Sequence, residues 1–377
     1  MKLLIGADIV PTISNQSCFE RAEMEQVVDQ GLREVLASAD YRIFNLEVPL
    51  TDHVSPIKKC GPNLIASTKC VAGLKQLGIN FLTLANNHMM DQGEQGLQST
   101  IKKLELANIA YAGVGATPEK AAEPYVVALG EKIVGIYCCA EHEFSIVGEG
   151  RPGANPFEPL DSLDHIAELK KQCDYVICLY HGGKEHYRYP SPGLQKSCRK
   201  MVEKGADLVV CQHSHCIGCE EKWKTGTIVY GQGNFLFDNS NSEFWMTSIL
   251  VQVDLSDFSI MYIPIKKQEN SVCLATGEEA LQIISSMRDR SKQIQQNGFV
   301  ENTYTEFAKT MMAGYMMRDR PASKNVFFRI IDKVMGHRIS ASIVRKRLRR
   351  YALLYINQYD CEAHRELILR GLESSVE

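Results

Sequence analysis

The sequence lacks long apolar runs. The longest are strand-sized, at residues 3–5, 81–85 and 133–140, whereas a helix needs roughly 20 apolar residues to cross a bilayer. We therefore expect no transmembrane helix. The first run stops before Asp8, which makes it too short for a signal-peptide core, and no small-residue cleavage site follows it. We expect no cleaved leader and a cytoplasmic location.

The sequence also lacks a strong excess of charge of either sign. Among 377 residues, 42 Lys and Arg oppose 45 Asp and Glu, for a net charge of -3. This balance excludes a polycation built for nucleic acid and an acidic tail protein. An apolar content of 45% indicates an ordinary globular protein, and the length suggests two structural units.

A disulfide pattern is absent as well, although the chain has 13 cysteines. Their number is odd, and several, such as Cys138, Cys178 and Cys211, lie inside apolar runs where cysteine acts as a small hydrophobic residue. Reduced core thiols are the preferred interpretation. The one close pair, Cys216 and Cys219, is weak evidence for zinc or redox chemistry without a second pair.

Strand and helix signals alternate from residue 2 to residue 211. Strand-like runs at 2–7, 42–46, 81–85, 126–140, 175–180 and 208–211 are separated by amphipathic stretches, and strands follow one another directly from 227 to 267. This order predicts a layered α/β sandwich with helices on the outside. After about Gly277 the signal is helical, so we predict one domain over residues 1–277 and a helical region over residues 278–377.

The charge is uneven between these two regions. Residues 278–377 hold 17 basic and 12 acidic residues, against 25 and 33 in residues 1–277. The densest basic stretch lies between Arg318 and Arg350, opposed only by Asp319 and Asp332. Apolar residues interleave at helical spacing, so a solvated helix face is the default interpretation. The alternative is peripheral contact with anionic lipid headgroups or with a polyanionic substrate.

Metal-binding residue types follow most of the strand-like runs in the first 240 residues. They are Asp8, Glu47, Asn86, Asn87, His88, His181, His213 and His215. Loops that follow parallel strands gather at one edge of a sheet, where α/β proteins build their sites. Carboxylates, imidazoles and a carboxamide oxygen suit divalent manganese, iron or zinc, and a shared carboxylate can hold two ions. A single histidine at a strand end is usually a surface residue, but five such junctions together favour a metal site.

Several segments resemble the CapA family of bacterial capsule and poly-γ-glutamate synthesis proteins. They are GAD at 6–8, FNLEVPLT at 44–51, LANNHMMDQG at 84–93, YHGGKE at 180–185, GADLVVCQHSH at 205–215 and YGQGNFLFD at 230–238. The resemblance covers residues 2–254 in the family's order. That family is similar to the calcineurin-like metallophosphoesterases, so the resemblance implies a four-layer α/β/β/α sandwich with a two-metal site and a helical C-terminal extension.

The resemblance also implies roles for individual residues. Six would bind metal: Asp8, Glu47, Asn87, His181, His213 and His215. Asp8 and His215 would hold the first ion, Asn87, His181 and His213 the second, and Glu47 would stand at the bridging position. His88 would be a non-ligand acid that protonates the leaving group. We expect Asn86, Glu185, Tyr187 and Asn234 to bind substrate.

Two departures from the phosphoesterase pattern affect the expected metal content. Val10 stands where the phosphoesterases have a histidine, so the first ion would lack one ligand. Glu47 replaces the usual aspartate and is one methylene longer. We therefore expect one or two divalent ions, and the alternatives of a different metal or of a site that binds without turnover stay open.

Two classes of function are consistent with these features. The first is a metal-dependent hydrolase or transferase of capsule, exopolysaccharide or poly-γ-glutamate synthesis, acting on a phosphoester or on an amide of a γ-linked polymer. The second is a non-catalytic scaffold that binds polymer or holds a synthase at the membrane. The Val10 departure favours the second class, whereas His88, which a binding site does not need, favours the first. Nuclease activity is disfavoured because the first 277 residues are net acidic, so we expect no nucleic-acid partner.

Overall fold

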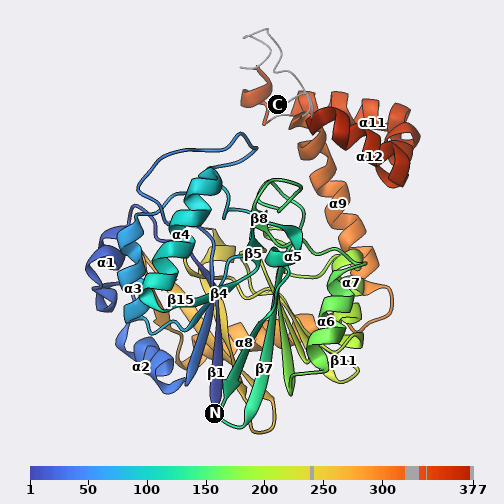
Figure 1. Cartoon of the computed structure of the whole chain (residues 1–377). Coiled ribbons are helices and arrows are strands. Elements are labelled where there is room, and N and C mark those ends of the chain that lie inside the picture. The colour runs from blue at the N-terminus through green and yellow to red at the C-terminus, as the bar shows by residue number, and fades with distance from the viewer. Residues whose placement is uncertain (238–241, 319–330, 337, 374–377) are drawn as a thin grey trace. The chain divides into compact units, whose positions relative to one another are not determined.

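Two β-sheets form the centre of the protein (Figure 1). The computed structural model describes residues 1–237, 242–318, 331–336 and 338–373. The first sheet has the order β16 (Ser271–Leu274), β15 (Ser259–Gln268), β14 (Thr247–Asp254), β1 (Lys2–Ile9), β2 (Tyr41–Leu46), β3 (Phe81–Thr83) and β4 (Ala110–Ala112), with β13 (Asn234–Leu236) also paired to β1. The second has the order β11 (Glu220–Trp223), β12 (Gly226–Tyr230), β10 (Leu208–Gln212), β9 (Tyr175–His181), β7 (Lys132–Ala140) and β6 (Tyr125–Leu129). A small pair joins β5 (Val114–Gly115) to β8 (Gly153–Ala154).

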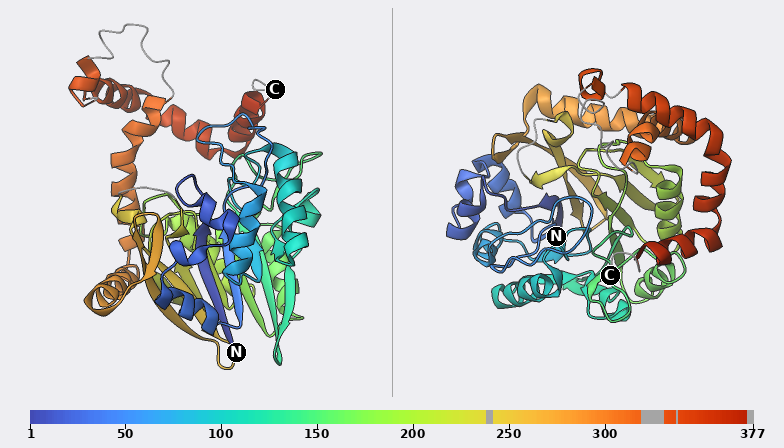
Figure 2. Two further views of the ribbon diagram at one scale, coloured as in Figure 1. Left: turned by 90° about the vertical axis from the view of Figure 1, so that its left-hand side faces the viewer. Right: turned by 90° about the horizontal axis from the view of Figure 1, so that it is seen from above.

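Helices cover the outer faces of the two sheets (Figure 2). Those on the first sheet are α1 (Gln16–Arg21), α2 (Gln30–Ser38), α3 (Val71–Gln76) and α4 (Gly93–Ala107). Those on the second are α6 (Ser162–Lys170) and α7 (Pro192–Glu203), while the short α5 (Pro118–Ala121) lies next to β5. The predicted four-layer α/β/β/α sandwich, the arrangement implied by the resemblance to metallophosphoesterases, is confirmed.

The central strands are apolar on both faces because each face is covered. In β1, every residue after Lys2 is buried. One core cluster fills the space between the sheets, where Leu3 and Ile5 of the first join Ile177 and Val210 of the second. A second cluster packs the outer face of the second sheet against α6 and α7.

Local sequence explains where several elements begin and end. Ser191 caps α7 by accepting a hydrogen bond from the Leu194 backbone N–H at 3.0 Å, and Pro192 occupies the first turn. The apolar run at 126–140 is a hairpin rather than one strand, because Gly130 adopts a φ of 63° at the turn between β6 and β7. In β1, a Cβ on Gly6 would lie 1.8 Å from the Phe44 ring, so a larger residue here would require that ring to move.

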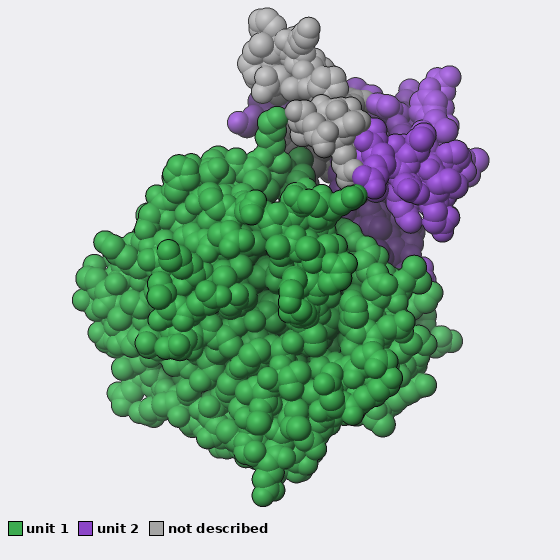
Figure 3. Space-filling view, viewed as in Figure 1, with its two compact units in different colours: residues 1–300 green, residues 301–377 purple. Residues whose placement is uncertain are grey.

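The chain divides into two compact units, residues 1–300 and 301–377 (Figure 3). The first unit extends past the predicted boundary at residue 277 because α8 (Gly277–Gln293) buries Ile283 and Met287 in the core of that unit. From α8 onward the described elements are helices, namely α9 (Phe299–Arg318), α11 (Arg338–Asp360) and α12 (Glu362–Glu373). Among the described residues, no helix is both long and apolar enough to span a bilayer. Arg320, Lys324 and Arg329 of the basic stretch lie outside the described residues, as does Asp238.

Candidate metal centre

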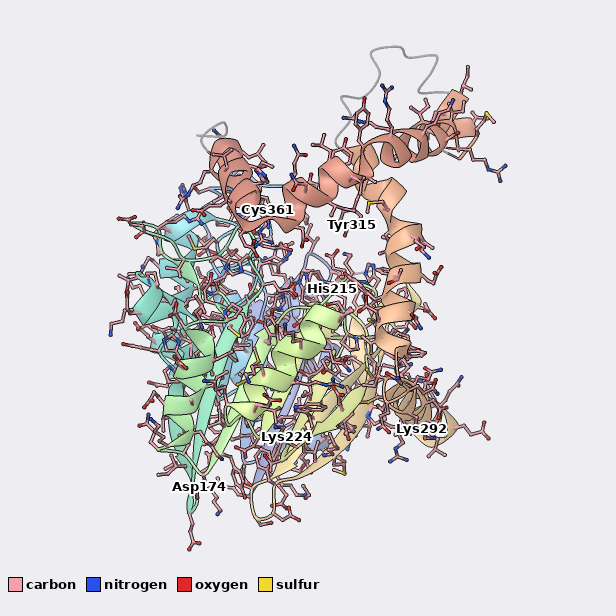
Figure 4. The ribbon with its side chains drawn as sticks, turned by 90° about the vertical axis from the view of Figure 1, so that its right-hand side faces the viewer. Asp174, His215, Lys224, Lys292, Tyr315 and Cys361 are labelled. Carbon is pink, nitrogen blue, oxygen red and sulfur yellow. The ribbon has the colours of Figure 1, made fainter. Side chains whose placement is uncertain are left out.

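Strand pairing brings the predicted ligands together. Asp8 lies near the end of β1, where it pairs in parallel with Asn45 of β2, and Glu47 follows β2 directly. His181 ends β9 and pairs with Gln212 of β10. His213 and His215 come immediately after β10, and Figure 4 shows His215 at the ends of the strands. These residues therefore meet where the two sheets present the carboxyl ends of their parallel strands.

Two groups of three side chains have the geometry to hold an ion. Ligand atoms of Glu47, His181 and His213 lie within 4.8 Å of one another, and so do those of Asp8, Glu47 and His215. All five residues are buried. Because Glu47 belongs to both groups, its carboxylate lies at the position of a bridging ligand.

Unpaired oxygens show that a cation fits this site. Both carboxylate oxygens of Glu47, and Oδ2 of Asp8, are buried and accept no hydrogen bond from the described residues. His181 Nε2 is the near neighbour of Glu47 Oε1, at 3.3 Å. A buried carboxylate without a partner is costly, and a divalent cation would compensate for it. Val10 is buried in the core and has no ligand atom, so the group around Asp8 lacks the fourth protein ligand expected of the phosphoesterase pattern.

Asn87 lies beside the group formed by Glu47, His181 and His213. Its Oδ1 lies 3.1 Å from His181 Nε2, which in turn lies 3.1 Å from His213 Nδ1. His181 and His213 are thus well within the distance at which both could bind one ion. Asn87 Nδ2 donates to Glu143 Oε2 at 3.2 Å, and Glu143 Oε1 is 4.0 Å from His213 Nε2. Glu143 therefore borders the group of Glu47, His181 and His213.

Two asparagines, Asn45 and Asn234, hold predicted ligands of both groups in place. Asn45 donates from Nδ2 to Asp8 Oδ1 at 2.8 Å, and the same nitrogen lies 3.2 Å from His181 Nδ1. His215 Nδ1 lies 2.9 Å from Asn234 Oδ1 and 3.6 Å from Asp8 Oδ2. When Nδ1–H donates to Asn234, the other ring nitrogen of His215 is left to bind metal.

The surroundings shift the pKa values of the ligands in different directions. Burial, together with the Asp8 charge, raises the pKa of Glu47 to about 8. Burial lowers the pKa of His181 to about 4 and that of His213 well below its usual value. His215 is different: although burial opposes it, the charges of the Asp8 and Glu47 carboxylates raise its pKa to about 9. Neutral His181 and His213 are ready to bind metal, whereas Glu47 and His215 must first release protons.

His88 lies next to these ligands but outside both groups. Its Nδ1 is 2.6 Å from Asp91 Oδ2, and its backbone N–H donates to Asn86 Oδ1 at 3.1 Å. Its side chain is 12% exposed, whereas that of Asp91 is fully buried. With Nδ1 held by Asp91, Nε2 is the nitrogen free to act on a substrate. The predicted acid role remains a prediction.

The predicted substrate-binding residues differ in their surroundings. Asn86 is fully buried, and its Nδ2 donates to Asn45 Oδ1 at 3.0 Å and to the Leu46 carbonyl at 2.8 Å. Asn234 is 7% exposed and contacts His215 as described above. Asn86 is thus occupied by internal contacts, whereas Nδ2 of Asn234 is buried and has no hydrogen-bond partner among the described residues. Contact of either side chain with substrate stays a prediction.

Glu185 and Tyr187 follow β9 on the loop that packs against the segment of His213 and His215. The backbone N–H of His186, between them, donates to the Ser214 carbonyl at 2.8 Å. Glu185 is exposed; although desolvation opposes it, the charges of Lys184 and His213 lower its pKa. Tyr187 is buried, with its ring 5.9 Å from that of Tyr189. Glu185 is therefore the more accessible of the two for contact with a substrate.

Sequence reasoning missed Asn45, Asp91 and Glu143. Asn45 is a polar residue inside the apolar run of β2, and that interruption is a signal of a buried role. Asp91 follows His88 by three residues within the same strand-end segment. Glu143 lies three residues after β7 and directly after His142, a strand-end signal that sequence reasoning did not use.

Residues 3–239 match the sequence model of a protein family described as bacterial capsule synthesis protein PGA_cap. The chain belongs to this family. Every predicted ligand of the metal centre, and His88, lies inside the part of the chain that matches the PGA_cap model.

Curated relatives carry capsule-related names. The chain is 31% identical over 248 residues to the capsule biosynthesis protein CapA of Bacillus anthracis, covering 63% of this chain and 60% of that protein. It is 28% identical over 217 residues to the PGA biosynthesis protein CapA of Bacillus subtilis, covering 55% and 56%. The matches therefore span a little over half the length of these relatives. Among solved structures, a novel phosphatase of Mycoplasma pneumoniae is similar with a TM-score of 0.43 at 15% identity, over 71% of this chain and 94% of that one.

Proposed function

We propose that this protein is a metal-dependent hydrolase or transferase of capsule, exopolysaccharide or poly-γ-glutamate synthesis. Its substrate would be a polymer or a phosphorylated precursor, attacked at a phosphoester or at an amide of a γ-linked chain. The observation that carries the proposal is the buried carboxylate of Glu47, shared by two groups of ligands and without a hydrogen bond among the described residues. The names of the family and of its relatives supply the polymer context.

Each residue would have a distinct task. One or two divalent ions, of manganese, iron or zinc, would supply Lewis acidity and an activated water. Glu47 and the histidines would hold them, and Asn45 would fix Asp8 and His181. His88 would donate a proton from Nε2 to the leaving oxygen or nitrogen while Asp91 holds its Nδ1.

Metal analysis and turnover assays test the proposal together. Protein purified without chelator would be analysed for metal, then assayed on bis(p-nitrophenyl) phosphate and on poly-γ-glutamate. We expect bound divalent metal and turnover of one substrate, with both lost in Glu47→Gln. If protein loaded with manganese, iron or zinc turns over neither substrate, the hydrolase proposal is contradicted.

A second candidate is a non-catalytic scaffold that binds polymer. Val10 favours it, because the buried apolar side chain leaves the group around Asp8 with three ligands. Isothermal titration of poly-γ-glutamate into metal-loaded protein separates the candidates. A scaffold binds the polymer and leaves its length unchanged, whereas the hydrolase or transferase changes the length or ends of the chain.

We also propose that this protein works in the cytoplasm and contacts anionic lipid through α11. The sequence of α11 has no acidic residue before Asp360, and Lys346, Arg347 and Arg350 are exposed on it. Leu353, like several other apolar residues of α11, is also exposed. A helix with exposed basic and apolar residues is typical of membrane-surface contact.

Liposome sedimentation at low salt tests this contact. We expect pelleting with vesicles that contain phosphatidylglycerol and little with pure phosphatidylcholine, because lipid charge attracts the basic side chains. Changing Lys346, Arg347 and Arg350 to glutamine should abolish the difference. Equal pelleting with both vesicle types contradicts the contact.

A further inference from the structure

A closed surface loop, residues 51–66, leaves the first sheet after β2 and returns before α3. Its ends are joined, because the Thr51 N–H donates to the Ala66 carbonyl at 2.9 Å and the Ala66 N–H donates to the Pro49 carbonyl at 3.1 Å. It is the blue excursion above α4 in Figure 1. Most of its residues are exposed and none forms a helix or strand. Compact loops with joined ends are frequently functional.

Lys59 is an exception within this exposed loop. Its side chain is only 3% exposed, while the neighbouring Lys58 is exposed. The Lys59 ammonium pairs with Oδ1 of the fully buried Asp91 and lies 3.3 Å from His88 Nδ1. Burying an ammonium group is costly and is tolerated where the charge is paired. The loop thus inserts one charged group directly behind the ring of His88.

The Asp91 carboxylate connects the loop to His88. One oxygen, Oδ1, accepts from Lys59. The other, Oδ2, accepts from the Leu64 N–H at 2.6 Å and lies 2.6 Å from His88 Nδ1, while the Asp91 carbonyl accepts from the Ile57 N–H at 3.1 Å. Two residues of the loop backbone and the ring of His88 are therefore held by one buried residue, and Lys59 fixes the orientation of its carboxylate.

The neighbours of Asp91 fasten the same loop. Gln92 accepts from the Ser55 N–H at 2.7 Å and donates from Nε2 to the Leu64 carbonyl at 3.0 Å. Gln95 donates from Nε2 to the His53 carbonyl at 2.9 Å. These neutral contacts hold the rim of the loop, so the removal of Lys59 alone should loosen its central part without unfolding the unit.

We propose that Lys59 is a positioning residue that makes the 51–66 loop a working part of the site. By holding Asp91 Oδ1 it keeps Oδ2 directed at His88, and so keeps His88 Nε2 directed at the substrate. The part of this proposal that concerns turnover rests on the proposed hydrolase function. The part that concerns the loop and the ring of His88 does not.

Three variants test the proposal: Lys59→Met, Lys59→Arg and, as a control on the same loop, Lys58→Met. Metal content should match wild type in all three, since no ligand is changed. We expect hydrogen exchange of the 51–66 peptides to quicken by about tenfold in Lys59→Met and to stay unchanged in Lys58→Met. Turnover of bis(p-nitrophenyl) phosphate should fall in kcat by about tenfold to a hundredfold in Lys59→Met, with KM within about twofold of wild type. Lys59→Arg keeps the charge and should recover most of both losses.

Two outcomes of the exchange and kinetic measurements overturn the proposal. One is unchanged exchange of the loop in Lys59→Met, which would mean that Lys59 does not hold it. The other is an active wild type whose kcat survives Lys59→Met. If the wild type turns over no substrate, the hydrolase function has failed, and a crystal structure of Lys59→Met then decides this proposal separately. A loop and a His88 ring in their original positions would overturn it, and a displaced ring would support it.

Discussion

The candidate metal centre and the buried cysteines of the second sheet differ in whether their polar atoms have partners. Both regions include metal-binding residue types on or just after β9 and β10. Cys178 and Cys211 lie within these strands, and Cys211 Sγ is 3.6 Å from Cys198 Sγ of α7. Burial raises the pKa of Cys178 and of Cys198, so these thiols stay protonated and pack as apolar groups. In the metal centre, by contrast, the buried carboxylate oxygens of Glu47 and Oδ2 of Asp8 have no hydrogen bond within the described chain.

The comparison teaches that residue type alone does not define a metal site. A buried thiol is satisfied by apolar neighbours, whereas a buried carboxylate requires a donor or a cation. Cys216 and Cys219 belong with the thiols, since both are free and fully buried and burial raises the pKa of each.

Removing a shared ligand should have the largest effect. Glu47→Gln takes the carboxylate from both groups, and His213→Asn removes an imidazole from one, so metal content should fall to a small fraction of wild type. Activity should disappear with it. Mass-spectrometric metal analysis of protein purified without chelator measures this, with Glu34→Gln on exposed α2 as a matched control. Undiminished metal in Glu47→Gln would remove the proposed bridging role.

His88→Asn should separate metal binding from turnover. The predicted ligands remain, so metal content should stay near wild type, while kcat falls about a hundredfold or more because the proton donor is lost. Steady-state kinetics on the substrate that the wild type turns over provide the measurement. An unchanged rate would show that His88 is a hydrogen-bonding residue of the strand-end segment and not the acid.

Raising the pH by one unit should strengthen metal binding by roughly tenfold for each proton that metal binding releases. In the metal-free protein the pKa of Glu47 is raised to about 8 and that of His215 to about 9, so both hold protons at neutral pH. In the unfolded chain both side chains have their usual, lower pKa values. Above those values Glu47 is ionised and His215 is neutral in the unfolded chain, while both still hold their protons in the folded protein. Stability of the metal-free protein therefore falls as the pH rises from 6.5 to 8.

The observable is the difference in Tm between metal-loaded and EDTA-treated protein. This difference in Tm should increase from pH 6.5 to 8. As the pH rises, the metal-free protein loses the protons that stabilise it, and metal competes with fewer protons for the ligands. Thermal melts in buffers of equal ionic strength measure it. Glu47→Gln, which should bind little metal, should show almost no difference in Tm at either pH. A wild-type difference that is constant with pH would contradict the assignment.

Changing a core thiol should have the smallest effect. Cys198→Ala removes one sulfur from the second core cluster and should cost about 1 kcal/mol of unfolding free energy, as for loss of one buried methylene-sized group. Metal content should not change. Denaturant unfolding and metal analysis check the two parts, and a loss of metal would show that the thiols and the strand-end ligands are not independent.

The sequence was sufficient for the parts of the fold and site that depend on regular strands. Asp8, Glu47, His181, His213 and His215 each lie at or just past a strand end, and parallel pairing brings them together. Lys59 could not be predicted, because the 51–66 loop has no hydrophobic period and Lys58 beside it looks equivalent in sequence. Whether such a side chain is buried depends on contacts with residues distant in the chain, here Asp91.

The domain boundary shows the same limit of local pattern. The change from strands to helices near residue 277 is visible in sequence, but it marks a change of secondary structure and not the end of the core. Ile283 and Met287 pack into the first unit through contacts made by α8 with strands that precede it. Helical spacing predicts the apolar face of α8, but not which surface that face covers.

The central place of β1 has a consequence for how the protein is made. Although β1 is the first strand to leave the ribosome, one of its neighbours is β14, which is complete only at Asp254. The ligands are synthesised over a similar interval, from Asp8 to His215. Metal can therefore occupy the complete site only after most of the first unit has been translated, so loading should follow translation of this unit rather than begin with the nascent N-terminus.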